Sequence, residues 1–242
     1  MSGHSKWAQI KHKKGVADQK RGMLFTKLGN AITVAARQGG GDPDLNFTLR
    51  LAIEKARAAN MPKENIERAI KRGTGELAGE SLEEVTYEGF GPDKVAFIIK
   101  CLTDNKNRTV NEIKYILEKN GGSLAGPGSV MWMFKNLAVL TINKEQPLIN
   151  KNIDELELEL IDLGVEDVKN NNQEIVVYTK PEDLKKVKED LENKGVKIES
   201  AEIKFVPREK IETSNEVREK LKKLFEELDG HQDVSSYYTN LA

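Results

Sequence analysis

The sequence predicts a multidomain protein of the α and α+β classes, with an N-terminal three-helix domain followed by two α+β domains, at least one of them ferredoxin-like. Three observations predict this architecture. Apolar residues recur at three- and four-residue steps from about Arg21 to Arg72, the period of helices that bury one side. Beyond Gly79, short runs typical of strands alternate with single helices. At 242 residues, the chain is also longer than one ordinary domain of roughly 100–150 residues.

Residues 1–77 are expected to form a basic helical domain. The first helix has one apolar stripe, formed by Phe25, Leu28, Ile32 and Ala35. The glycine-rich break at 39–43 ends this helix, and Asp44 is the expected N-cap of the second. Pro62 suits the first turn of a third helix, and Gly73 is expected to end it. The predicted result is a small three-helix bundle.

Residues 78–136 together with 207–242 are expected to form a middle α+β domain. The expected elements are strands at 82–89, 94–102 and 129–135, a helix at 108–119, a terminal helix at 214–228 and a last strand at 232–239. The terminal helix and strand would complete a unit that otherwise lacks them. The segment between the two parts is therefore predicted to be an insertion.

That insertion, residues 137–206, reads as strand, helix, strand, strand, helix, strand. Its pieces are LAVLTI, IDELELELIDL, VEDVK, EIVVYT, PEDLKKVKEDLENK and KIESAEIKFV. This order is that of the ferredoxin-like split βαβ arrangement. The sequence therefore predicts a ferredoxin-like α+β domain inserted into the middle domain.

The charge of the chain is divided between two regions. Residues 1–75 contain 15 Lys and Arg against 6 Asp and Glu, a net charge of +9, whereas the remaining residues contain 23 against 33, a net charge of −10. Most of the positive charge lies in GHSKWAQIKHKKGVADQKRG, where Asp18 is the one acid. A basic segment releases counterions from a phosphate backbone, and this gain supplies most of non-specific nucleic-acid affinity. The charge pattern therefore predicts a nucleic-acid-binding protein.

Lysines of this region are expected to neutralise phosphates, and an exposed Trp7 indole can stack on a base. The alternative is a solvated tail with Trp7 packed on the bundle. Further cations extend the charge across the helices, namely Lys55, Arg57, Lys63 and Arg68. The candidate nucleic-acid-binding residues are Lys6, Trp7, Lys11, Lys13, Lys14, Lys20, Arg21, Lys27, Arg37, Arg50, Lys71, Arg72 and Arg108.

Arg108 is a candidate because the segment 103–109 lies where a predicted strand passes into a helix. Asn107 or a neighbour can cap that helix, and the exposed backbone N–H groups there would offer an anion site. The alternative is an ordinary capped loop. Similarly, Gly126-Pro127-Gly128 is expected to be a flexible loop, with a function only where it contacts a partner.

Cys101 lies on one face of a predicted strand, in phase with Val95, Phe97 and Ile99. We therefore expect a buried and inert thiol. As the one cysteine, it excludes an intrachain disulfide framework and fits a reducing compartment. The chain has no apolar run near the roughly 20 residues of a membrane span, and its N-terminus lacks the apolar stretch of a secretory signal. These features predict a cytoplasmic protein without a membrane partner.

The sequence offers no convincing motif of an enzyme or of a bound cofactor. Its histidines, His4, His12 and His231, have no Cys or carboxylate companions at metal-ligand spacing. Residues 73–78 loosely match a dinucleotide-binding fingerprint, but they follow a helix where that fingerprint must follow a strand. The phosphate-binding pattern GxxxxGK[ST] does not occur. We therefore expect a non-enzymatic protein with neither a cofactor nor a metal.

Several strings taken together resemble the YebC/PmpR family, in order along nearly the whole chain. They are GHSKWAQIKHKK, FTKLGNAITVAARQGGGDP, RLAIEKARAANMPKENIERAIKRGTGE, YEGFGP, CLTDNKNRTV and NGGSLAGPGSV. The match is strongest over residues 3–76 and weaker through 137–205. The resemblance implies three domains, the last inserted into the middle one, and a bacterial cytoplasmic protein. Family members are usually described as transcriptional regulators, and some bind promoter DNA. Others, including a mitochondrial relative, act on the ribosome and activate translation.

Residues and resemblance together predict a non-enzymatic regulator of gene expression that binds DNA through its basic N-terminal domain. The alternative is a ribosome-associated, RNA-binding translation factor, because a basic segment with one aromatic suits ribosomal or messenger RNA equally well. The expected partner is nucleic acid in either case, with the ribosome added in the second. The two acidic α+β domains are expected to contact protein, since their charge opposes broad nucleic-acid contact.

Overall fold

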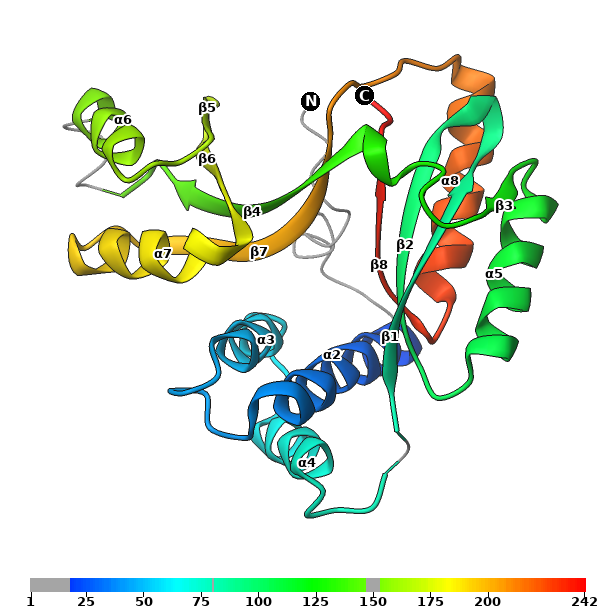
Figure 1. The fold of residues 1–242 in the computed structure, drawn as a ribbon, viewed down its shortest axis with the longest axis horizontal. Coiled ribbons are helices and arrows are strands. Elements are labelled where there is room, and N and C mark those ends of the chain that lie inside the picture. The colour runs from blue at the N-terminus through cyan, green and yellow to red at the C-terminus, as the bar shows by residue number, and fades with distance from the viewer. Residues whose placement is uncertain (1–17, 80, 147–152) are drawn as a thin grey trace. The chain divides into compact units, whose positions relative to one another are not determined.

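The structure is a computed structural model that describes residues 18–79, 81–146 and 153–242 (Figure 1). The chain divides into two compact units. The larger unit comprises Met1–Phe134 and Pro207–Ala242, and the inserted unit comprises Lys135–Val206. Helices precede two four-stranded sheets, which confirms the predicted fold class. The three domain boundaries expected from the sequence stay a prediction.

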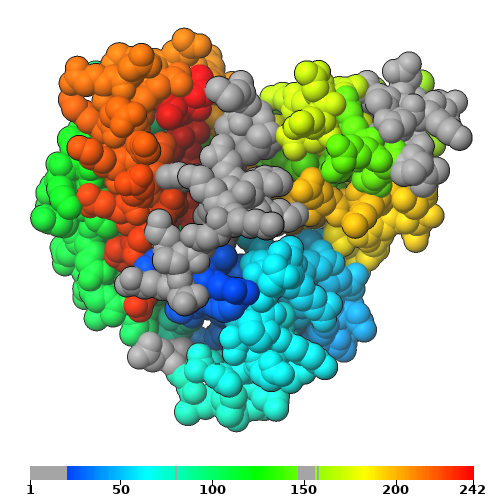
Figure 2. Space-filling model, turned by 180° about the vertical axis from the view of Figure 1, so that it is seen from behind, coloured from blue at the N-terminus to red at the C-terminus, as the bar shows by residue number. Residues whose placement is uncertain are grey.

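The helical bundle of the larger unit contains α2 (Asp18–Gly39), α3 (Phe47–Ala58) and α4 (Lys63–Thr74). Its buried core includes Leu28, Ile32, Ala35, Leu49, Ile53, Ile66 and Ala69. Because these residues recur at helical spacing on all three elements, the predicted apolar stripes are confirmed. Figure 2 shows the atoms of the bundle, coloured blue to cyan, as one contiguous surface.

The expected N-cap of the second helix, Asp44, is wrong, because α3 is capped by Asn46. The Asn46 side-chain oxygen accepts a hydrogen bond from the backbone N–H of Leu49 at 3.1 Å. Its amide nitrogen donates to the carbonyls of Ala35 and Gly40, both at 2.8 Å. The amide accepts from the helix and donates to the preceding loop at once, which an ionised carboxylate such as that of Asp44 cannot do.

The third helix also ends later than expected. Gly73 lies inside α4, which ends at Thr74, and Gly75 at φ 84° forms the left-handed C-cap. A Cβ on Gly73 would lie 2.5 Å from the Thr33 carbonyl oxygen and 2.6 Å from the Ala36 Cβ. Gly73 therefore permits the close approach of α2 and α4 instead of ending the helix. Pro62 is the N-cap residue immediately before α4, one position earlier than its expected place.

The sheet of the larger unit has the strand order β3-β1-β2-β8. Its strands are β1 (Glu83–Phe90), β2 (Ala96–Thr103), β3 (Ser123–Ala125) and β8 (Val234–Thr239), with a short 3-10 turn at Pro92–Lys94. α5 (Lys106–Lys119) and α8 (Asn215–Gly230) lie side by side beside this sheet (Figure 1). Cys101 is buried in the core with Val95, Phe97 and Ile99, as predicted.

The strand expected near 129–135 is wrong. The third strand is β3, which precedes it and pairs with β1 through Glu88, Gly89 and Phe90. Residues Met131–Met133 form a 3-10 turn, and the next strand begins only at Phe134. Backbone N–H groups of this segment bind a side chain rather than a neighbouring strand, as described below, so the segment is held as a loop.

The inserted unit has the strand order β5-β6-β4-β7. Its elements are β4 (Phe134–Asn143), α6 (Ile153–Asp162), β5 (Asp167–Asn170), β6 (Glu174–Thr179), a 3-10 turn (Pro181–Asp183), α7 (Leu184–Asn193) and β7 (Ile198–Pro207). The first and third strands are central and pair antiparallel, with Leu140 opposite Val177. This order confirms the ferredoxin-like prediction. Within the described residues, no helix is both long and apolar enough to span a membrane.

The close approach of α2 and α4 predicts a large effect of Gly73→Ala. The added Cβ must displace the backbone around Thr33, so we expect a loss of about 1–3 kcal/mol in unfolding free energy despite the better helix propensity of alanine. The matched control is Gly22→Ala in α2, whose Cβ would meet nothing within 4 Å. That change should stabilise the protein by about 0.5–1 kcal/mol. Chemical denaturation measures both, and equal effects of the two substitutions would contradict this packing.

Candidate nucleic-acid interface

Each helix of the bundle carries basic residues in its last turn. These are Arg37 on α2, Lys55 and Arg57 on α3, and Lys71 and Arg72 on α4. Cations at the C-terminus of a helix are favoured by its dipole, so part of this placement has a structural cause. Three such turns on a small bundle nevertheless concentrate positive charge, which can attract a polyanion.

The strongest concentration lies on α4. Arg68, Lys71 and Arg72 are exposed, and their spacing of three and four residues makes them neighbours on the helix surface. Across the described ranges, these three side chains have no acidic partner, in contrast to Lys63, which pairs with Glu67 at 3.5 Å. Unpaired surface cations can neutralise phosphates without first breaking an internal ion pair.

The N-terminal candidates are only partly described. Lys6, Trp7, Lys11, Lys13 and Lys14 lie outside the described residues. Lys20 belongs to α2, and Arg21 is exposed on the same helix, with its guanidinium 5.5 Å from the centre of the Phe25 ring. Their contacts to nucleic acid stay a prediction.

Arg37 and Arg50 form hydrogen bonds within the larger unit. Arg37 donates to the Ser81 hydroxyl at 2.8 Å and to the Leu82 carbonyl at 3.3 Å, where the bundle is linked to β1. Arg50 donates to the carbonyls of Pro43 and Asp44, both at 3.0 Å, and so shapes the loop between α2 and α3. Any contact of these side chains with a phosphate competes with these hydrogen bonds.

Lys27 is buried, unlike a residue that contacts a phosphate. Its side chain points into the protein, the residue is only 8% exposed, and Nζ donates to the Asp229 carbonyl of α8 at 2.9 Å. Burial lowers the pKa of Lys27 to about 8, although the Asp229 carboxylate acts in the opposite direction. This corrects the expectation that Lys27 reaches a phosphate, because its ammonium is shielded and joins the bundle to α8 instead.

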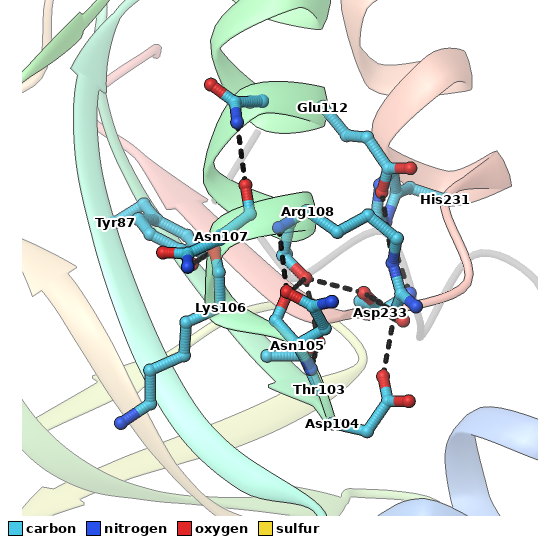
Figure 3. Close-up of polar contacts among 12 residues, drawn as sticks. Tyr87, Thr103, Asp104, Asn105, Lys106, Asn107, Arg108, Glu112, His231 and Asp233 are labelled. Atoms are coloured by element: carbon cyan, nitrogen blue, oxygen red, sulfur yellow. Dashed lines mark hydrogen bonds and ion pairs between the residues drawn. The ribbon is translucent and has the colours of Figure 1, made fainter.

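Arg108 is held by two carboxylates in the network of Figure 3. Its guanidinium donates to Asp104 at 2.9 Å and to Asp233 at 2.8 Å. Asp233 is buried and also accepts from the Thr109 hydroxyl at 2.7 Å. Burial alone would raise the pKa of Asp233, but these donors hold it below its usual value. The N-cap of α5 is Asn105, two residues before Asn107. Arg108 thus links α5 to the residue that precedes β8. Its role in phosphate binding stays a prediction.

The same network gives His231 companions that sequence spacing did not indicate. One ligand-capable atom each from His231, Glu112 and Asp233 lies within 4.8 Å of the others. These groups are already engaged: His231 Nε2 lies 3.0 Å from the Glu112 carboxylate, and Nδ1 accepts the backbone N–H of Asp233 at 3.1 Å (Figure 3). Arg108 also holds the carboxylate of Asp233. These hydrogen bonds join α5 to the C-terminal end of α8, and they already occupy the groups that a ligand would need.

Sequence reasoning missed the role of Glu88, whose side chain anchors the loop at 126–131. Glu88 is 5% exposed, and its carboxylate accepts the backbone N–H groups of Gly128 at 2.6 Å, Val130 at 2.7 Å and Met131 at 2.9 Å. Burial alone would raise the pKa of Glu88, but the three N–H donors hold it below the usual value. The Gly126-Pro127-Gly128 loop is therefore tied to β1, contrary to the expectation of a flexible loop.

The anchored loop leads to an exposed tryptophan that sequence reasoning also missed. Trp132 is 66% exposed, beside the exposed Arg208. The Nε atom of Arg208 donates to the Trp132 carbonyl at 3.0 Å. A tryptophan between two methionines reads as core in a sequence, and only the structure shows that this side chain is exposed while Val130 and Phe134 are buried.

Residues 5–76 match the family model described as the TACO1/YebC protein N-terminal domain, and residues 82–241 match the TACO1/YebC second and third domain. The chain belongs to the TACO1/YebC family. This membership confirms the resemblance noted in the sequence, and the matches together cover most of the chain.

Relatives within the TACO1/YebC family match over nearly their whole lengths. One from Natranaerobius thermophilus, named "Probable transcriptional regulatory protein", is 49% identical and is covered to 96%, with 99% of this chain. One from Moorella thermoacetica with the same name is 50% identical and is covered to 95%, again with 99% of this chain. The crystal structure of a conserved hypothetical protein from Aquifex aeolicus is 43% identical, with a TM-score of 0.83 over 98% of this chain and 97% of that one.

The Glu88 anchor predicts a pH-dependent contribution to stability. Because the carboxyl pKa is lowered on folding, its contribution is full above the ordinary value of 4.5 and is lost as pH falls through the lower folded pKa. Glu88→Gln should therefore cost about 1.5–3 kcal/mol at neutral pH, with a difference from the native protein that shrinks in acid. Denaturation at several pH values measures this difference.

The matched control is Glu84→Gln on the same strand. Glu84 pairs at the surface with Lys100 at 2.6 Å, and such pairs contribute about 0–1 kcal/mol. A loss at Glu88 no larger than at Glu84, or one that persists unchanged in acid, would contradict the anchoring role.

Proposed function

We propose that this protein is a non-enzymatic regulator of gene expression that binds DNA through its basic N-terminal domain. The observation that carries the proposal is the exposed trio Arg68, Lys71 and Arg72 on α4, which has no acidic partner across the described ranges. The N-terminal basic stretch adjoins the same bundle in the sequence. The printed names of the relatives, which describe transcriptional regulators, support this reading.

A surface of this kind binds nucleic acid through the phosphate backbone. Cations from helix ends contact phosphates and fix orientation, but they carry no sequence information directly. We expect the protein to bind duplexes of different sequence with similar affinity unless a partner adds base contacts. The inserted unit opposes wide nucleic-acid contact, since it contains 16 Asp and Glu against 11 Lys and Arg. We expect this unit to contact protein.

A ribosome-associated, RNA-binding translation factor is the second candidate, because Trp132 is a solvent-exposed aromatic held on an anchored loop. Unpaired RNA bases stack on such side chains, whereas duplex DNA keeps its bases inside. A pull-down from native lysate separates the two candidates when recovered DNA and RNA are sequenced. Ribosomal RNA enriched by the full chain, and lost on removal of residues 1–21, favours translation. Discrete genomic fragments without ribosomal RNA favour transcription.

The decisive test of phosphate binding by α4 is the salt dependence of duplex DNA binding by the triple variant R68Q/K71Q/R72Q. We expect weaker binding and a log–log slope flatter by roughly 0.9 for each lost phosphate contact, measured by titration between about 50 and 200 mM salt. The matched control is Lys27→Met, which removes a positive charge that is buried against α8. It should leave the slope unchanged.

Two results would sink the proposal. An unchanged slope in the triple variant would exclude α4 from the interface. A slope that flattens in Lys27→Met by the same amount per removed charge as in the triple variant would show that total charge, rather than this surface, sets the affinity.

A further inference from the structure

The loop that follows β3 holds Trp132 exposed, while its indole N–H and its backbone carbonyl are both hydrogen-bonded. Its indole Nε1 donates to the Ser129 carbonyl at 3.0 Å, and its own carbonyl accepts from Arg208 Nε at 3.0 Å. The backbone N–H of Arg208 donates to the Met133 carbonyl at 2.9 Å. The preceding residues are tied to Glu88 by the three hydrogen bonds described above.

These bonds leave the exposed part of the indole ring available for stacking. Because Nε1 is already satisfied inside the loop, the side chain does not need a ligand acceptor. A fixed ring loses little conformational entropy when a flat partner stacks on it. Arg208 is exposed beside it, and its terminal guanidinium nitrogens have no partner within the described part of the chain. An aromatic face next to a cation suits a base and its phosphate.

We propose that Trp132 and Arg208 form a stacking site for one unpaired base of a single-stranded nucleic acid. The base lies on the indole and Arg208 contacts the adjoining phosphate. This inference rests on the proposed function for the class of ligand, but it uses a different part of the larger unit from α4. The stacking site would also give the protein a preference for unpaired over duplexed strands, which the cations of α4 alone do not provide.

A protein ligand is less well supported by the surroundings of the ring. A protein hot spot usually has a rim of further apolar contacts that exclude water. Here the neighbouring loop residues Pro127, Gly128 and Ser129 are exposed, and the other exposed large apolar side chains of the described chain belong to other segments. Trp132 is thus the one large apolar side chain of this loop that is mostly exposed, with the partly buried Met131 and Met133 on either side of it in the sequence. The exposed cation Arg208 beside it favours a base with its phosphate as the ligand.

Fluorescence provides a direct test because the chain contains two tryptophans. In a Trp7→Phe background, Trp132 is the one remaining tryptophan, and its emission can be excited selectively over that of the tyrosines. We expect an oligouridine RNA to quench its emission and a duplex DNA to leave it nearly unchanged. Trp132→Leu should weaken oligouridine binding roughly 5- to 100-fold, the range for one stacked base, without altering duplex affinity. Arg208→Gln should weaken oligouridine binding and flatten its salt dependence.

The matched control is Tyr115→Leu, which removes another exposed aromatic, 64% exposed, from α5. It should leave both affinities unchanged. If oligouridine binds without quenching Trp132, and Trp132→Leu keeps the native affinity, the stacking site is wrong while the proposed grip stands. If the native chain binds neither RNA nor duplex DNA, both the proposed function and the stacking site that rests on it are wrong. Quenching with duplex DNA equal to that with oligouridine would overturn the preference for unpaired bases.

Discussion

The carboxylate of Glu88 fixes the place where the chain leaves the larger unit and returns to it. By taking three backbone N–H groups of the loop at 128–131, it prevents that segment from extending as a strand and delays β4 until Phe134. The returning chain is bonded at the same place, through Arg208 to the carbonyls of Trp132 and Met133. A buried carboxylate is costly unless several donors satisfy it, so this anchor holds only while the loop keeps its shape. Both connections to the inserted unit are therefore hydrogen-bonded within the larger unit, the outgoing one to Glu88 and the returning one to the outgoing one.

Positive charge in the larger unit serves two different purposes. Lys27, Arg37, Arg50 and Arg108 bind carbonyls, hydroxyls or carboxylates of their own unit and hold its parts together. Among the described residues, Arg68, Lys71 and Arg72 make no such side-chain contact, and they lie exposed on α4. Net charge alone does not distinguish the two groups. The internal contacts distinguish cations that hold the unit together from exposed cations that can bind a polyanion. The proposed interface therefore centres on the exposed cations of α4 and the basic stretch that precedes the bundle.

Much of the fold could be predicted from the sequence, because helical and strand periodicities are local properties. The stripe of Leu28 and Ile32, the phase of Cys101 in β2 and the ferredoxin-like order of the inserted unit all follow from spacing alone. The misses depend on contacts between distant segments. Gly73 reads as a helix end until Thr33 is placed against it, and Glu88 reads as an ordinary strand residue until the loop forty residues later is seen around it. Candidate cations could be found by charge, but their partners could not, which is why Lys27 entered the predicted set.

The central claim, that nucleic acid is gripped by the basic N-terminal part of this family member, can be tested by photo-crosslinking. The full chain would be irradiated with a short duplex DNA that carries photoreactive thymines, and the cross-linked peptides identified by mass spectrometry. We expect cross-links within residues 1–77, including the peptide that contains Lys71 and Arg72. Cross-links confined to the acidic inserted unit, Lys135–Val206, would contradict it.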